Sequence, residues 1–137
     1  MAKPQQSVAC QKFKYFLVLD FEANCQEGSR LNPQEIIEFP CLLVDAKSHE
    51  IISSFHKYVK PVGIPELTPF CTQLTGITQD MIANEDTFPH VLEHFLNWYK
   101  ENELNSTEAC FVTCGLWDLS TMLPLQCSYS GMKECLS

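Results

Sequence analysis

The first half of the chain alternates between short apolar runs and polar turns. Residues 14–21 are largely apolar and predict a central strand, buried on both faces of a sheet. Residues 36–44 and 50–59 predict two further strands, joined by a polar turn at residues 45–48. Strands joined by short turns indicate an antiparallel meander.

Helical patterns follow from residue 68 onward. Thr68 and Pro69 are typical of a helix N-cap and first turn, and Gly76 is placed to end that short helix. Thr78 then begins another helix. Apolar residues at helical spacing predict an amphipathic helix over residues 89–99.

The last two predicted elements are a strand and a helix. Residues 109–114 form an apolar run between polar turns and predict a second buried strand. A helix opens at residues 117–119, and Pro124 is expected to disturb it within about two turns.

The resulting order is three antiparallel strands, a crossover helix, a parallel strand and a helix. This order predicts an α/β fold with a ribonuclease H-like mixed sheet. We expect three regions: a flexible arm at residues 1–12, the folded domain at 13–127, and a divergent tail at 128–137.

Two carboxylates, Asp20 and Glu22, stand where the first strand ends. Their i, i+2 spacing sends both side chains to one face, where like charges are usually tolerated only with a cation between them. The strand order brings Asp118 to the same edge. A strand that simply ends in solvent explains the first pair equally well, and the context has to decide.

Composition restricts the classes of function. The 137 residues suffice for one domain, with 45% hydrophobic and 19% charged residues. Nine Lys and Arg against 17 Asp and Glu give a net charge of −8, which argues against a simple electrostatic nucleic-acid binder. The sequence shows no signal-peptide pattern and no apolar run long enough for a bilayer.

Other metal-binding patterns are weaker. The eight cysteines lack a C-x-x-C pair, so reduced thiols are favoured over disulfides or structural zinc. His90 and His94 are four residues apart on the amphipathic helix, which could hold a metal, although a polar helix face is the favoured interpretation.

Four blocks together resemble one family. They are FLVLDFEANC at residues 16–25, PQEIIEFP at 33–40, LTPFCTQLTGI at 67–77 and FVTCGLWDL at 111–119. In this order they resemble the Eri-type 3′-to-5′ exoribonucleases of the DEDD superfamily, most closely the prion-protein-interacting exoribonuclease branch. The resemblance runs from about residue 12 to about residue 126.

The resemblance implies roles for individual residues. Asp20, Glu22 and Asp118 match the family's metal-binding and catalytic acids, with Asp20 placed to bridge two ions. Mg²⁺ or Mn²⁺ in a two-metal site is the implied cofactor. The implied substrate-binding residues are Phe21, Ala23, Thr75, Gly76 and Ile77, although residues 75–78 can also be a plain joint between two helices.

The chain also departs from the family pattern. Asn24 stands where the family usually has Thr, and Leu116 where this branch usually has Asp. The family's general-base His and final metal-binding Asp follow the second motif, but no His and no Asp follows Asp118 here. The match is therefore to a domain incomplete at its C-terminus, consistent with a truncated product.

Three functional hypotheses follow. The first is a metal-dependent 3′-to-5′ exoribonuclease that hydrolyses terminal phosphodiesters of RNA to nucleoside monophosphates. The second is an inactive truncated form acting as an RNA- or protein-binding module, which the missing His and Asp favour. The third is an unstable fragment, because part of the sheet is left uncovered. The expected partners are RNA 3′ ends and a further protein, with no membrane and no small-molecule cofactor, in an intracellular location.

Overall fold

The computed structural model describes residues 10–133, so residues 1–9 of the expected arm and residues 134–137 of the expected tail lie outside the described residues. The strands are β1 (Tyr15–Leu19), β2 (Glu22–Ala23), β3 (Ile36–Asp45), β4 (Ile51–Tyr58) and β5 (Ala109–Val112). The helices are α1 (Pro69–Thr75), α2 (Gln79–Ile82), α3 (Phe88–Glu101), a π-helical turn η1 (Asp118–Met122) and α4 (Leu123–Tyr129).

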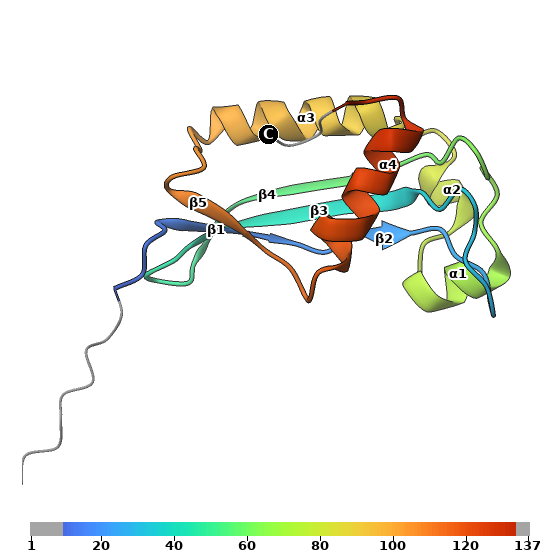
Figure 1. Ribbon diagram of the computed structural model, residues 1–137, viewed down its shortest axis with the longest axis horizontal. Coiled ribbons are helices and arrows are strands. Elements are labelled where there is room, and N and C mark those ends of the chain that lie inside the picture. The colour runs from blue at the N-terminus through green and yellow to red at the C-terminus, as the bar shows by residue number, and fades with distance from the viewer. Residues whose placement is uncertain (1–9, 134–137) are drawn as a thin grey trace, which may run out of the picture.

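The strands form one mixed sheet. β1 lies between β3, to which it is antiparallel, and β5, to which it is parallel, and β4 pairs with β3 on the side away from β1. The crossover connection from β4 to β5 passes through α1, α2 and α3 (Figure 1). The predicted α/β class, with three antiparallel strands and then a parallel one, is confirmed.

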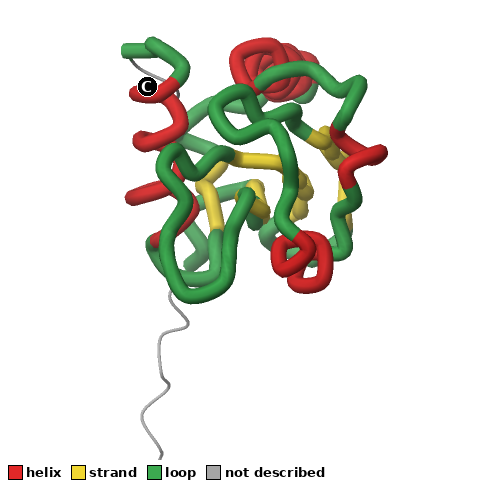
Figure 2. The backbone as a smooth tube through the Cα atoms, turned by 90° about the vertical axis from the view of Figure 1, so that its right-hand side faces the viewer, coloured by secondary structure: helices red, strands yellow, loops and turns green. Residues whose placement is uncertain are grey.

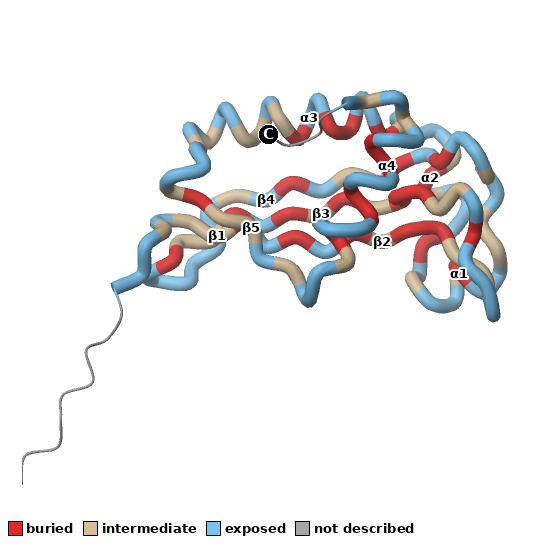
Figure 3. Tube along the Cα trace, in the orientation of Figure 1, coloured by how far each residue is buried: buried red, intermediate tan, exposed pale blue. Residues whose placement is uncertain are grey.

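The first predicted strand differs from expectation in two ways. It is interrupted at Asp20 and Phe21 and resumes as the two-residue β2, which pairs with β3 through a β-bulge. It is also buried on one face only, since Leu17 is 1% exposed and Val18 is 38% exposed. Figure 3 shows this alternation of buried and exposed positions along the sheet. One face of these strands is uncovered, so the apolar run of residues 14–21 wrongly predicted burial on both faces.

The buried face of the sheet packs against α3. The Phe39 ring stacks on Phe95 of α3 with ring centroids 4.8 Å apart and meets Phe21 and Phe55 edge to face. Such contacts stabilise a core beyond the area they bury.

A second, smaller cluster holds α1 and α2. It comprises Ile37, Cys71, Ile77 and Ile82, with Tyr58 partly buried against it. In the view along the strands in Figure 2, helices lie above and below the sheet: α3 is on one side and α1 on the other. The α1–α2 unit thus covers one end of the face that α3 leaves open.

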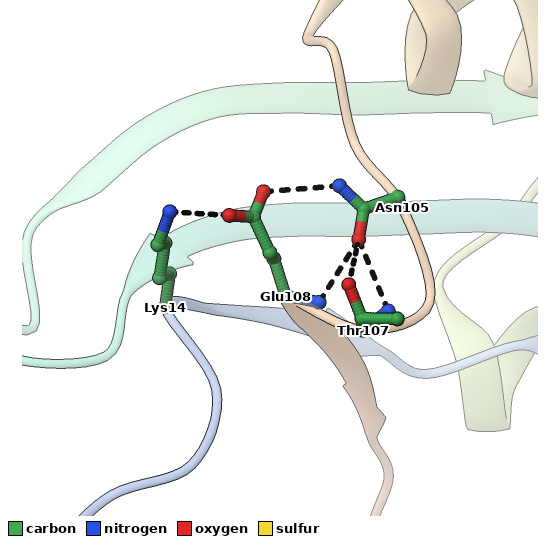
Figure 4. Close-up of polar contacts among 4 residues, drawn as sticks. All are labelled: Lys14, Asn105, Thr107 and Glu108. Carbon is green, nitrogen blue, oxygen red and sulfur yellow. Dashed lines mark hydrogen bonds and ion pairs between the residues drawn. The ribbon is translucent and has the colours of Figure 1, made fainter.

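The loop before β5 is fixed to the start of β1. Lys14 forms an ion pair with Glu108 (Figure 4). The Glu108 carbonyl also accepts hydrogen bonds from the N–H groups of Lys14 and Tyr15. Asn105 Oδ1 accepts from Thr107 and Glu108, which shapes the turn. These contacts set the parallel register of β5 against β1.

The helix that opens at residues 117–119 changes character next to Pro124, as expected, but the chain stays helical beyond it. Its first turn, η1, is π-helical, with the Leu123 N–H bonded to the Asp118 carbonyl. Pro124 then falls in the first turn of α4, where a missing N–H donor is tolerated.

α4 is tied to the sheet by Gln126. This side chain is 1% exposed, and its Oε1 accepts the Ile36 N–H at 2.7 Å. Within residues 10–133, none of the helices has the length and apolar character that crossing a membrane requires.

Candidate functional site

Asp20 and Glu22 follow the end of β1 and share the sheet face that α3 does not cover. Phe21 between them is 2% exposed, and its ring packs on Phe39 in the core. Because side chains alternate along a strand, the burial of Phe21 directs both carboxylates outward. The same-face arrangement expected from the i, i+2 spacing is therefore present.

Asp118 reaches the same point from the segment that follows β5, the parallel neighbour of β1. It is the first residue of η1 and only 3% exposed, and its Oδ1 accepts the Phe21 N–H at 2.8 Å. This bond joins Asp118 to the backbone between Asp20 and Glu22. The convergence predicted from the strand order is thus seen in the structure.

Burial and neighbouring carboxylates raise the pKa of both Asp20 and Glu22. Partial burial raises the pKa of Asp20 above its ordinary value, and repulsion from Asp118 and Glu38 adds to the rise. Burial also raises the pKa of Glu22, and Asp20, Glu38 and Asp118 raise it further. Concentrated negative charge of this kind is relieved when a cation binds.

The donor set fits a hard divalent ion in chemistry. Carboxylate oxygens are the ligands that Mg²⁺ and Mn²⁺ prefer, and Asp20, Glu22 and Asp118 supply such oxygens at one edge of the sheet. Across residues 10–133, however, no group of three or more His, Cys, Asp or Glu side chains is already arranged to hold a metal ion. The acids would have to move together around the ion.

Glu38 is a member of this carboxylate group that the sequence analysis missed. It lies directly opposite Glu22 in the β2–β3 ladder, and its Oε1 is 2.7 Å from Nε2 of His56 on β4. The only signal was its polar position in the apolar run of residues 36–44. Cross-strand register would have been needed to place it.

The loop at residues 75–78 is built as its sequence indicates. Thr68 caps α1 by accepting the Cys71 N–H at 3.0 Å, and Gly76 ends α1 with a left-handed φ of 76°. Thr75 Oγ1 donates to the Cys71 carbonyl and accepts the Ile77 N–H. These bonds give the loop a fixed backbone beside the open face.

Three of the predicted substrate-binding residues have buried side chains: Phe21 and Ile77 are 2% exposed and Ala23 is 7% exposed. They can offer a substrate only their backbone. Thr75 is half-buried and Gly76 is exposed.

The residues that depart from the family pattern lie close to these acids. Asn24 is buried, and its Oδ1 accepts the Glu35 N–H at 2.7 Å while its Nδ2 has no hydrogen-bond partner among the described residues. Leu116 is 78% exposed. Trp117 packs against the main core.

The alternative metal candidates do not assemble. His90 and His94 are both exposed on α3, as a polar helix face requires, and His94 Nε2 lies 3.9 Å from Asp86. Six cysteines are free thiols, namely Cys10, Cys25, Cys41, Cys71, Cys110 and Cys114. Cys127 is disulfide-bonded, so the expectation of reduced thiols holds for those six only.

Comparison with known proteins gives a consistent result. Residues 17–135 match the RNase_T family model, described as exonuclease. The chain is 52% identical over 124 residues to ERI1 exoribonuclease 3 of Homo sapiens, covering 89% of this chain and 36% of the relative. It thus spans about a third of the length of that curated relative.

Solved structures agree with the sequence match. The nuclease domain of 3′hExo, a DEDDh family member bound to rAMP, superimposes with a TM-score of 0.82 at 41% identity, covering 88% of this chain and 62% of that one. A 3′-exonuclease structure on 3′-end specific recognition of histone mRNA stem-loop also gives 0.82, at 40% identity, covering 88% of this chain and 55% of that one. The resemblance to Eri-type exoribonucleases and the ribonuclease H-like fold are both confirmed.

Proposed function

Because this chain belongs to the RNase_T exonuclease family, we propose that it acts as a metal-dependent 3′-to-5′ exoribonuclease. Its reaction is hydrolysis of the terminal phosphodiester of RNA, with release of a nucleoside monophosphate. The expected substrates are RNA 3′ ends, and Mg²⁺ or Mn²⁺ is the cofactor.

The observation that carries this proposal is the hydrogen bond between the Phe21 N–H and Asp118 Oδ1. It brings the acids of two distant motifs to one sheet edge and leaves Asp20 and Glu22 directed away from the core. Divalent ions at such an edge supply an activated water and stabilise the leaving 3′ oxygen. Asp20, Glu22 and Asp118 hold the ions, and the backbone of residues 75–77 positions the terminal nucleotide.

A second function is favoured by one observation, the lack of a ready-made metal group within the described residues. Under this alternative the chain binds RNA 3′ ends or a protein partner and hydrolyses little. In that case Asp20, Glu22 and Asp118 reflect descent from an active enzyme, and the open sheet face is the binding surface.

A degradation assay separates the two functions. The purified protein is incubated with a 3′-labelled single-stranded RNA and Mg²⁺ or Mn²⁺, beside an Asp20→Ala/Glu22→Ala variant. A matched control, Asp80→Ala/Glu93→Ala, removes two exposed acids elsewhere. Metal-dependent release of labelled mononucleotide by the wild type and the control, but not by the site variant, is the expected result.

Binding of the RNA without release by any variant would favour the binding module. A folded wild-type protein that neither binds nor shortens the RNA would contradict the exonuclease and the RNA-binding form of the second function, and would leave only binding of a protein partner.

A further inference from the structure

His56 and Glu38 form an ion pair on the same open face as the candidate metal ligands. In the sheet register Glu22 pairs with Glu38, and Glu38 in turn pairs with Tyr58 of β4. Residues directly opposite one another point to the same face, and His56 shares that face with Tyr58 because they are two positions apart. Phe55, next to His56, packs on Phe95 of α3 on the opposite face.

The imidazole of His56 is held in place on two sides. Its Nε2 is 2.7 Å from Glu38 Oε1, and its ring meets the Tyr58 ring edge to face with centroids 4.9 Å apart. The side chain is still 48% exposed, and within residues 10–133 its Nδ1 has no hydrogen-bond partner. The ring therefore presents a free nitrogen to the solvent in a fixed direction.

The position of His56 suits a second nucleotide. Neighbouring strands are about 4.8 Å apart, so β4 lies about 10 Å from β2 across β3. Tyr58, beside His56, packs against the cluster that contains Ile77 of the nucleotide-positioning loop. A strand of RNA that lays its terminal nucleotide between the acids and this loop passes close to His56.

The negative charge of this face indicates a specific role for His56 in binding a phosphate. Asp20, Glu22 and Glu38 lie on this face, and the chain has a net charge of −8. An RNA backbone is repelled by such a surface wherever bound ions do not neutralise it. A protonated imidazole whose one N–H is directed by Glu38 can donate the other to a phosphate.

We infer that His56 is a substrate-binding residue whose Nδ1–H contacts a phosphate of the RNA on the 5′ side of the scissile bond, with Glu38 orienting the ring. This inference rests on the proposed function, since it assigns a second contact of the same substrate. It also gives the Glu38–His56 pair a role beyond an exposed ion pair, which alone contributes little to stability.

The test measures binding of a single-stranded RNA whose 3′-terminal linkage is a phosphorothioate, in Mg²⁺ at about pH 6, where histidine is generally protonated. We expect His56→Ala to raise Kd about tenfold and to reduce the slope of log Kobs against log salt concentration by about 0.7, the value for one phosphate contact on a single strand. His56→Lys restores the charge and should restore the slope. His90→Ala, an exposed histidine on α3, is the matched control and should leave both values unchanged.

The outcomes separate the two proposals. If the wild type binds or shortens RNA while His56→Ala matches His90→Ala in Kd and slope, the inference fails and the proposed function stands. A salt slope that His56→Lys does not restore would also overturn it, because the loss would then be structural. If the folded wild type neither binds nor hydrolyses RNA, both proposals fail together.

Discussion

Asp118 has a structural role besides the metal-binding role proposed for it, because its buried carboxylate accepts the Phe21 N–H. Asp118→Asn keeps an oxygen acceptor and removes the charge, so the free energy of unfolding should stay near the wild-type value. Metal affinity should nevertheless fall at least about tenfold. Asp118→Ala leaves the Phe21 N–H without a partner and should lower the free energy of unfolding by about 1 to 3 kcal/mol.

Urea denaturation and calorimetric Mn²⁺ titration of both variants measure the two quantities. Equal stability of the Asn and Ala variants would show that the hydrogen bond contributes nothing.

Asp20 and Glu22 predict a pH dependence of stability in the metal-free protein. Their pKa values are raised in the folded state, so the folded state binds more protons in the window just above the ordinary values of 3.8 and 4.5. The free energy of unfolding therefore falls as the pH rises through that window, and the full penalty is present at neutral pH. Asp20→Asn/Glu22→Gln should make the metal-free protein more stable at pH 7 than the wild type.

The difference between this variant and the wild type should vanish at low pH, where all these groups are protonated. Denaturation across a pH series in the presence of a chelator measures it. A variant that is less stable than the wild type at neutral pH would contradict the electrostatic argument.

At the level of single residues, much of the candidate site could be predicted from the sequence. Asp20, Glu22 and Asp118 could be brought together because carboxylates at strand ends and the order of strands are both legible in one chain. Glu38 and His56 could not, since their positions depend on a cross-strand register that includes a β-bulge. The burial of Ile77 was also missed, because it depends on how α1 and α2 pack on the sheet.

Among the elements, α1 depends on a single side chain at its N-terminus. Thr68 Oγ1 accepts the Cys71 N–H and donates to the Cys25 carbonyl at 2.6 Å, so it both caps α1 and joins it to the segment after β2. Thr68→Ala should lower the free energy of unfolding by about 1 to 2 kcal/mol. Thr72→Ala, on the same helix, is the matched control and should have a smaller effect.

Chemical denaturation measures both variants, and hydrogen exchange of the α1 amides shows whether the loss is local. Similar effects for the two variants would mean that the cap is not the stabilising contact.

The elements also show where local patterns mislead. The caps of α1 were legible because Thr, Pro and Gly each satisfy a local backbone need. The form of the helix before Pro124 could not be predicted, because a π-helical turn has no sequence signal of comparable strength. Tertiary contacts such as that of Gln126 with β3 hold this turn in place.

For the molecule as a whole, metal binding should raise thermal stability. An ion that binds only the folded state stabilises it by about 2.7 kcal/mol at a concentration one hundred times its Kd. Mn²⁺ or Mg²⁺ should therefore raise the Tm of the wild type and leave that of Asp20→Asn/Glu22→Gln unchanged. Thermal melts with metal and with chelator measure the shift, and an equal shift in both proteins would place the ion elsewhere.

The fold class was the most predictable property at this scale. The order of strands and helices fixed a mixed sheet, whereas the covering of its two faces could not be derived. Val18, Leu42 and Val112 are between 37% and 41% exposed on the open face although each lies in an apolar strand. Apolar residues report a preference for burial, but only the packing of other elements decides which face is covered.

The bond between Phe21 and Asp118 joins positions 97 residues apart. Contacts between positions so far apart in the sequence form slowly. The intervening chain must lose conformational entropy before the contact can stabilise the fold. During synthesis the antiparallel strands leave the ribosome first. Asp20 and Glu22 are therefore synthesised long before Asp118, and the contact cannot form until Asp118 has emerged. A chain that stops before residue 118 would therefore keep the sequence of β1, β3 and β4 and yet lack the contact that assembles the acids.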